Sequence, residues 1–154
     1  MAWGAITSNG KSTLVFVESG VKINKDEYQN TVLEDVLKPW ADPHFGNDRW
    51  CFQQDSVPAR KARTPQQWCK RERPYFIAHE DRPSNSLDLN PLDFSVWSVI
   101  ESKVCSTRHK SLASLKASLT EAWNGRSEDY LRATSDAFVT RLKTCVHKKG
   151  CQFE

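Results

Sequence analysis

The sequence has little that would mark a membrane, secreted or zinc-finger protein. It contains no apolar run near the roughly 18 residues that a membrane span needs, and its first residues do not follow the pattern of a signal peptide. Its five cysteines form no Cys-x-x-Cys pair, so it offers no zinc-ligand signature. An odd, scattered set of cysteines favours reduced thiols, and we therefore expect an intracellular protein.

Charge is nearly balanced overall but unevenly distributed. The 154 residues carry a formal net charge of +3, with 38% hydrophobic and 27% charged residues, as in one soluble globular domain. Basic residues concentrate in one region, where Glu72 is the lone acid from 60 to 73: Arg49 upstream, then Arg60, Lys61, Arg63, Lys70, Arg71 and Arg73. Such an excess can attract phosphate groups, although a solvated surface is the commoner meaning of a charge run. Trp68 and Tyr75 are candidate stacking groups, but a core position is favoured for Trp68.

Local patterns predict strands and helices mixed in the first two thirds of the chain, and helices alone afterwards. Asn9-Gly10 between two short apolar runs predicts a hairpin of residues 3–6 and 13–17. Asn24 is placed to cap a helix that Pro39 and Pro43 would end near residue 38. Its apolar positions predict one buried stripe: Tyr28, Val32, Val36 and Trp40, with Leu33 and Leu37 beside them. The elements predicted next are a strand at 50–54, a turn at 56–59, a helix at 64–71, a short strand at 75–78 and a loop at 81–89. Three helices follow. The first is capped by Asn90 and carries Phe94 to Val104, the second carries Leu112 to Trp123, and the third carries Leu131 to Cys145.

Asp55 and Asp93 occupy places where α/β domains carry chemistry. Asp55 ends the predicted strand 50–54, and Asp93 lies in the first turn of the helix capped by Asn90. Ligands of open sheets bind beyond the carboxyl ends of strands, and hard divalent cations prefer carboxylate oxygens. Two such ions about 4 Å apart can support phosphoryl transfer. Position alone nevertheless favours a turn residue for Asp55 and a helix cap for Asp93.

The motifs around the two aspartates are more specific than their positions. The segment 50–59, Trp-Cys-Phe-Gln-Gln-Asp-Ser-Val-Pro-Ala, resembles the Gln-Gln-Asp-x-x-Pro-Ala-His segment of mariner/Tc1-like transposases. The segment 83–93, Pro-Ser-Asn-Ser-Leu-Asp-Leu-Asn-Pro-Leu-Asp, resembles their Pro-x-Asn-Ser-Pro-Asp-Leu-Asn-Pro-x-Asp/Glu segment. The hairpin around Trp3-Gly4 and the ending Gly150-x-x-Phe153-Glu154 are also similar to the family. The resemblance therefore covers essentially the whole chain.

This resemblance implies an α/β, ribonuclease H-like fold with C-terminal helices, whose DDE/DDD site cuts and joins DNA with Mg²⁺ or Mn²⁺. Asp55 matches the second catalytic carboxylate and Asp93 the third, and their separation by 37 residues resembles the mariner-related branch called maT. Asp88, the other aspartate of the second motif, competes for the metal but is better suited to ordering the loop. The resemblance further implies a nuclear protein whose partner is DNA at transposon ends, with no membrane and no small-molecule substrate, and it leaves a homodimer open. The candidate DNA contacts are Arg60, Lys61, Arg63, Lys70 and Arg71.

The sequence also departs from the family pattern. The family's first catalytic aspartate lies on a central strand upstream of the hairpin, so we expect this strand, its aspartate and the N-terminal helix-turn-helix domains to be absent from residues 1–154. Arg60 stands where the family usually has His, and its fixed charge competes with a divalent ion at Asp55. Leu87 stands where the family usually has Pro, which loosens the loop. We expect one partial, truncated catalytic domain with a compromised or rearranged sheet.

Three interpretations of function are open at this level. The chain is a transposase catalytic-domain fragment that is inactive alone because one carboxylate is absent, or a non-catalytic nucleic-acid-binding or interaction module, or a transposon relic without a function of its own. Metal-dependent nicking of DNA that is lost in Asp55→Asn would overturn the inactivity expected of the first. Salt-dependent binding to DNA would favour the second.

Overall fold

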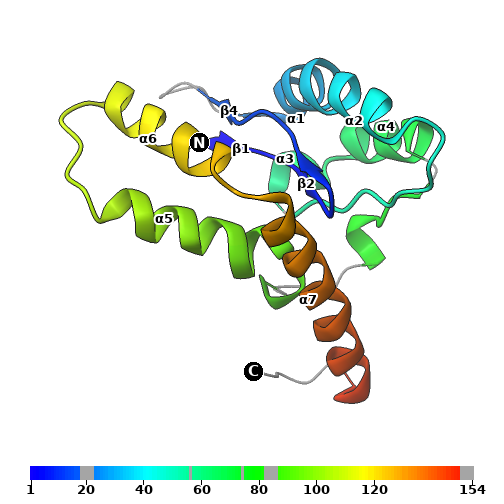
Figure 1. The fold of residues 1–154 in the computed structure, drawn as a ribbon. Coiled ribbons are helices and arrows are strands. Elements are labelled where there is room, and N and C mark those ends of the chain that lie inside the picture. The colour runs from blue at the N-terminus through cyan, green and yellow to red at the C-terminus, as the bar shows by residue number, and fades with distance from the viewer. Residues whose placement is uncertain (18–22, 56, 74, 82–86, 150–154) are drawn as a thin grey trace. The chain divides into compact units, whose positions relative to one another are not determined.

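The computed structural model describes residues 1–17, 23–55, 57–73, 75–81 and 87–149. The chain divides into two compact units. The first unit combines Met1–Gly4 with Val15–Asn85, and the second combines Ala5–Leu14 with Ser86–Glu154. The second unit is helical apart from a short hairpin, whereas the first mixes helices with isolated strand pairing (Figure 1).

A long helix in three consecutive parts dominates the first unit (Figure 1): α1 (Lys25–Glu27), η1 (Tyr28–Leu37) and α2 (Lys38–Phe45). Asn24 caps it as predicted, because its Oδ1 accepts hydrogen bonds from the backbone amides of Asp26 and Glu27 at 2.9 and 2.8 Å. The apolar stripe predicted for this helix is also confirmed. It buries Tyr28, Val32, Leu33 and Leu37.

The predicted end of this helix near Pro39 is wrong. The helix continues past Pro39 and Pro43 to Phe45, and Gly46, with a φ of 53°, follows its last residue. The η1 segment has wide π-type turns, so that the N–H of Lys38 bonds to the carbonyl of Leu33, five residues earlier. Pro39 then falls in the first turn of α2, where a missing N–H costs little.

Strand pairing in the first unit is sparse. β1 (Ala2–Trp3) pairs antiparallel with β4 (Val15–Phe16). The predicted strand 50–54 is reduced to one parallel bridge, in which Phe52 pairs with Phe76 of the strand predicted at 75–78. Among the described residues no sheet has more than two strands. The compromised or rearranged sheet expected from the family pattern stays a prediction.

Two helices follow the Phe52 bridge in the first unit. α3 (Pro58–Lys61) occupies part of the predicted turn, because Pro58 takes a first-turn position that its fixed φ favours. α4 (Arg63–Glu72) confirms the helix predicted at 64–71 within a residue at each end. α4 buries Trp68 and Cys69, so Trp68 is a core residue, as favoured, and not a stacking platform. The short η2 (His79–Asp81) comes last among the described elements of the unit.

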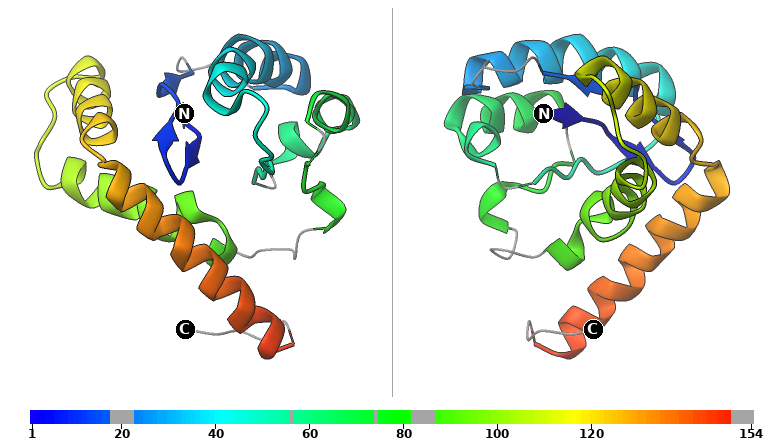
Figure 2. Two further views of the ribbon diagram at one scale, coloured as in Figure 1. Left: turned by 45° about the vertical axis from the view of Figure 1, so that its right-hand side comes forward. Right: turned by 90° about the vertical axis from the view of Figure 1, so that its left-hand side faces the viewer.

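The second unit opens with a hairpin formed by β2 (Ile6–Thr7) and β3 (Gly10–Lys11), so the chain reversal predicted at Asn9-Gly10 is confirmed. The strands predicted at 3–6 and 13–17 are shorter and interrupted, because only Ala2–Trp3 and Val15–Phe16 pair farther from the turn. Its helical elements are η3 (Leu87–Leu89), η4 (Leu92–Trp97), α5 (Ser98–Cys105), α6 (Leu112–Asn124) and α7 (Glu128–His147). α5 and α6 lie side by side in Figures 1 and 2. Together with η4 they supply the core of the unit: Val96, Ile100, Val104, Ala122 and Trp123. The hairpin joins this core through Lys11, whose Nζ donates to the carbonyls of Asn124 and Arg126 at 2.9 and 2.5 Å.

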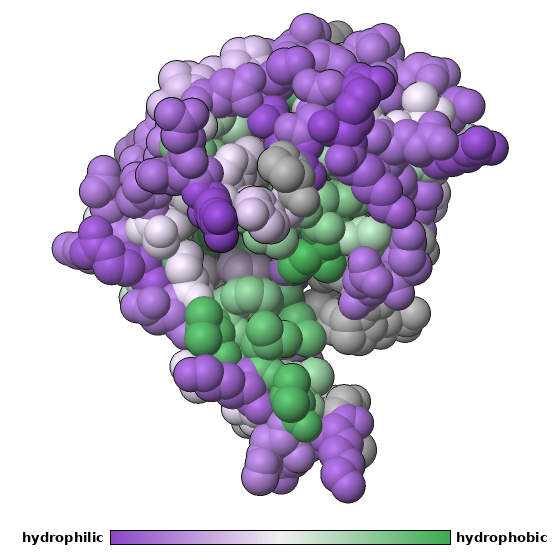
Figure 3. All heavy atoms as spheres, turned by 90° about the vertical axis from the view of Figure 1, so that its right-hand side faces the viewer, coloured by the Kyte–Doolittle hydropathy of each residue, from purple (hydrophilic) through white to green (hydrophobic). Residues whose placement is uncertain are grey.

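α7 differs from the other helices of the second unit in how much apolar surface it leaves open. The stripe predicted from Leu131 to Cys145 is buried only at its start, where Leu131 is 1% exposed. Farther along, Val139, Leu142 and Val146 are exposed, and Figure 3 shows apolar residues gathered where α7 runs. None of the described helices is long and apolar enough to cross a membrane.

Candidate functional sites at Asp55 and Asp93

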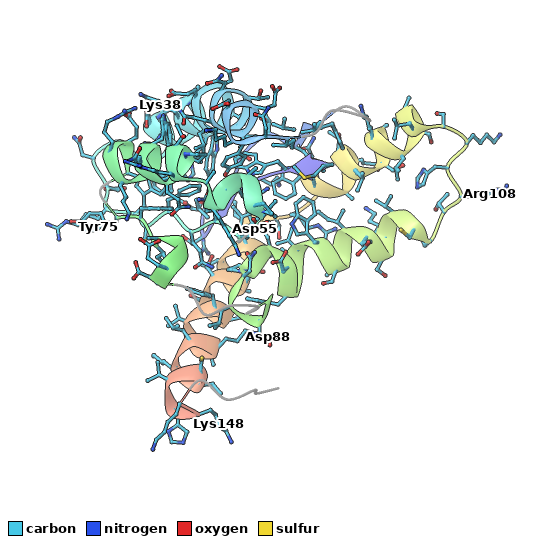
Figure 4. All side chains as sticks on the ribbon, turned by 180° about the vertical axis from the view of Figure 1, so that it is seen from behind. Lys38, Asp55, Tyr75, Asp88, Arg108 and Lys148 are labelled. Carbon is cyan, nitrogen blue, oxygen red and sulfur yellow. The ribbon has the colours of Figure 1, made fainter. Side chains whose placement is uncertain are left out.

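Asp55 lies in the first unit, between the Phe52 bridge and α3, and Figure 4 shows it beside that short helix. Both of its carboxylate oxygens have partners. Oδ1 accepts a hydrogen bond from the N–H of Val57 at 3.1 Å, which is the local turn contact expected of an aspartate before a helix. Oδ2 lies 2.5 Å from Nη1 of Arg60. The carboxylate is therefore neutralised within its own segment.

Arg60 is held firmly beside Asp55. Its side chain is only 12% exposed, compared with 32% for Asp55. The guanidinium carbon lies 5.3 Å from the centre of the Tyr28 ring, within the range of a cation–π contact. The Arg60 carbonyl accepts hydrogen bonds from the side-chain amides of Gln54 and Gln66, at 3.3 and 2.7 Å.

Tyr28 completes a buried polar network around this pair. Its hydroxyl donates to Oε1 of Gln54 at 2.9 Å. Burial raises the pKa of the Tyr28 hydroxyl well above its usual range, while the nearby Arg60 acts weakly in the opposite direction. Tyr28 is thus a neutral donor at any physiological pH. The sequence placed Tyr28 only on an apolar stripe, and nothing in the helical pattern showed that it would face the Asp55 motif.

Asp93 lies in the second unit, at the start of the helix formed by η4 and α5. Its Oδ2 accepts a hydrogen bond from Nδ2 of Asn90 at 2.6 Å. Oδ1 of Asn90 in turn accepts the N–H of Leu92 at 3.3 Å, and Pro91 is the first helical residue. The predicted helix start is confirmed, and Asp93 contributes to its cap. Because Asp55 and Asp93 belong to different units, their pairing in one metal site stays a prediction.

Asp88 has a structural contact of its own. It lies in η3, and its Oδ1 is 3.9 Å from Nη1 of Arg141 on α7. The guanidinium of Arg141 also lies 4.5 Å from the ring centre of Phe94, next to Asp93 in the chain. These contacts tie η3 and η4 to α7, as expected if Asp88 orders its loop.

The basic residues predicted to contact DNA fall into three groups. Arg60 is mostly buried and paired with Asp55, so it does not fit a role at the surface. Lys70 and Arg71 are exposed but lie 3.1 and 2.8 Å from Glu80 and Glu72. Lys61 and Arg63 are exposed. On α4, the exposed Arg63, Gln67, Lys70 and Arg71 share one face, because they are spaced by four, three and one residues.

The described residues fit a divalent metal poorly. They contain no group of three or more His, Cys, Asp or Glu side chains placed to hold an ion. At Asp55, a guanidinium already lies where a cation would bind, and the second oxygen bonds to the backbone. No step of a metal-dependent reaction can therefore be assigned to Asp55 in this arrangement.

Comparisons with known proteins identify similar chains. No protein-family profile matches. The chain is 28% identical over 152 residues to the Tc3 transposase of Caenorhabditis elegans, covering 97% of this chain and 44% of that protein. The crystal structure of the catalytic domain of Mos1 mariner transposase matches with a TM-score of 0.80 and 20% identity, over 96% of this chain and 72% of that one. A Mos1 paired-end complex with the left transposon end matches with a TM-score of 0.81 and 20% identity, over 99% of this chain and 44% of that one.

These matches confirm the predicted resemblance to mariner/Tc1 transposases and place it in the C-terminal part of the catalytic domain. At this identity the structural match establishes the shared fold, and it supports the predicted α/β, ribonuclease H-like class. The Mos1 catalytic domain has been solved with Mn and with Mg, so divalent metals occur in that relative. The chain spans less than half the length of the Tc3 transposase.

Proposed function

We propose that the chain is a catalytic-domain segment of a DNA transposase of the mariner/Tc1 kind. The observation that carries the proposal is that the two aspartate motifs lie in a chain of which 97% matches the Tc3 transposase. The Mos1 complexes with transposon ends and the Mos1 strand transfer complex support transposon-end DNA as the partner. A nuclear location and a homodimer belong to the proposal as further expectations, because the DNA substrate is chromosomal and transposon ends come in pairs.

We expect no strand cleavage by these 154 residues alone. They supply Asp55 and Asp93, two of the three carboxylates that the resemblance implies, so the third would have to come from residues outside the segment. Arg60 adds an obstacle inside the segment, because it neutralises Asp55. The expected inactivity of this segment does not require that the natural protein be truncated.

The activity is best tested in a chimera in which these 154 residues replace the matching segment of the Tc3 transposase. Nicking of a supercoiled plasmid that carries Tc3 ends is measured with Mn²⁺. We expect any nicking by the chimera to be lost in Asp55→Asn and in Asp93→Asn, and retained in the matched control Asp88→Asn. Nicking that survives both active-site substitutions would contradict the proposed roles. In the isolated 154-residue chain, nicking that depends on Asp55 would overturn the expected inactivity.

A second function, non-catalytic binding of nucleic acid, is favoured by the exposed basic face near α4. Lys61 and Arg63 point their charges to solvent, as shown by their exposure, and could contact phosphates. Each phosphate contact to duplex DNA steepens the slope of log affinity against log salt by about 0.9. Fluorescence anisotropy with a labelled duplex is the measurement. If both residues contact phosphate, Lys61→Gln with Arg63→Gln reduces the slope by about 2, while the exposed control Lys143→Gln leaves it unchanged.

A further inference from the structure

We propose that Arg60 is an internal cation that takes the place of a divalent metal ion at Asp55. The inference rests on the proposed function, because it concerns the carboxylate that the family resemblance assigns to the metal. It goes further in one respect. Arg60 would oppose metal binding even in a longer polypeptide that supplied every other ligand, so metal affinity is controlled from within this segment.

The first reason is that both carboxylate oxygens of Asp55 already have partners, and Arg60 is the charged one. Nη1 of Arg60 lies 2.5 Å from Oδ2, a charge-assisted contact, while Oδ1 accepts the N–H of Val57 at 3.1 Å. A divalent ion would have to displace the guanidinium to reach Oδ2. If the guanidinium stayed nearby, the ion would be repelled by a positive charge a few ångströms away in a partly desolvated setting.

The second reason is that Arg60 is built into the unit and does not merely swing over from the surface. Its guanidinium rests on the Tyr28 ring, and its carbonyl is clamped by Gln54 and Gln66. Tyr28 is 1% exposed, and the two glutamines are each 9% exposed. Moving the guanidinium aside would give up its contact with the buried Tyr28 ring, and the clamped carbonyl limits how far the Arg60 backbone can follow.

Nearby residues do not offer an alternative partner for Arg60. Its one ion pair among the described residues is with Asp55. Glu72 of α4 pairs with Lys38 and Arg71, and Glu80 of η2 pairs with Lys70. Arg60 and Asp55 thus form a closed pair, and the charge that Arg60 neutralises is the one a metal would need.

The experiment measures Mn²⁺ at Asp55 without any DNA or any cleavage. Paramagnetic broadening of the Asp55 and Val57 amide signals is followed by NMR as Mn²⁺ is added to the folded 154-residue chain. We expect no selective broadening in the wild type. Arg60→Gln should show it, with an apparent Mn²⁺ affinity at least about tenfold higher, which corresponds to about 1.4 kcal/mol. Adding Asp55→Asn to Arg60→Gln should abolish the gain, and the control Arg49→Gln, at an exposed arginine of the same unit, should behave as wild type.

Each result decides the question. Selective broadening in the wild type would overturn the proposal, and so would its absence in a folded Arg60→Gln variant. If Arg60→Gln does not fold, Arg60→Met preserves the aliphatic length over Tyr28 and removes the charge, while Arg60→Lys keeps the charge and should still exclude Mn²⁺. Equal gains in Arg60→Lys and Arg60→Met would show that shape, and not charge, excludes the metal. Because Arg60 would oppose metal binding in the chimera as well, the proposed function is tested separately in a chimera that carries Arg60→Gln. Failure of that chimera to nick DNA would bear on the proposed function and leave this binding result intact.

Discussion

Arg73, a buried cation between two tryptophans, provides a sharp test of how the first unit is stabilised. It is 7% exposed, and its guanidinium carbon lies 5.2 and 5.6 Å from the ring centres of Trp50 and Trp68. Its Nη1 lies 2.7 Å from Oδ1 of Asp42, whose side chain is half-exposed. Within the described part of the chain, its Nε and Nη2 are buried without a hydrogen-bond partner. We predict that replacing this arginine by an apolar residue costs less than removing its partner.

The magnitudes follow from these contacts. Two unpaired buried donors cost about 1–3 kcal/mol each, whereas two cation–π contacts contribute about 0.5–2 kcal/mol each. The ion pair adds about 1 kcal/mol or less, because Asp42 is well solvated. These effects nearly cancel, so Arg73→Met should change the free energy of unfolding by less than about 1 kcal/mol. Asp42→Asn leaves the buried charge without its counterion and should destabilise by about 1–2 kcal/mol.

Urea unfolding at pH 7, followed by circular dichroism, measures both variants, and hydrogen exchange of α4 amides assigns the change to the first unit. Arg63→Met is the matched control, because Arg63 is an exposed arginine at the start of α4, the helix that ends just before Arg73. It should leave the free energy of unfolding within about 0.5 kcal/mol of wild type. If Arg73→Met proved more destabilising than Asp42→Asn, the reasoning that the unpaired donors offset the aromatic contacts would be refuted.

Three further predictions concern single side chains. Trp123→Phe removes the indole N–H that donates to the Ser12 carbonyl at 2.8 Å, so urea unfolding should show a loss of about 1–3 kcal/mol, whereas the half-buried Trp97→Phe should cost less. Burial raises the pKa of the Cys69 thiol to about 12. Treatment with a disulfide reagent at pH 8, followed by mass spectrometry, should find exposed Cys105 modified and Cys69 unmodified. Rapid labelling of Cys69 in the folded protein would count against this burial. A hydrogen bond from Lys38, and after it one from Arg71, lowers the pKa of Glu72 from 4.5 to about 2. The stability that the ionised Glu72 contributes is therefore present above pH 4.5 and is lost as the pH falls toward 2. Glu72→Gln should show a smaller loss of stability over that pH range, and an unchanged loss would disprove the linkage.

Much of the local structure was predictable because its causes are local. Asn24 and Asn90 each marked a helix start, because a side chain that satisfies free amides at a helix end acts within three residues. The hairpin around Asn9-Gly10 was predictable for the same reason. The helix end at Pro39 was not, because the wide turns of η1 shift the hydrogen bonds so that a proline can follow, and residue type does not reveal that shift. Asp55 and Asp93 were found through their motifs, since either position alone looks like a turn or a cap.

The sequence by itself determined the family resemblance, the helix starts, the apolar stripes and the two aspartates, because each depends on residues that are near one another in the chain. Only the tertiary structure decided what surrounds Asp55. Tyr28 lies 27 residues before Asp55, on the helix that begins at Lys25, and Gln66 lies on the later helix α4, so no spacing rule brings them to Arg60. Sequence showed that Arg60 departs from the family pattern and carries a charge near the motif. The fold buries that charge, clamps its backbone and pairs it with Asp55, which turns a nearby cation into a competitor for the metal.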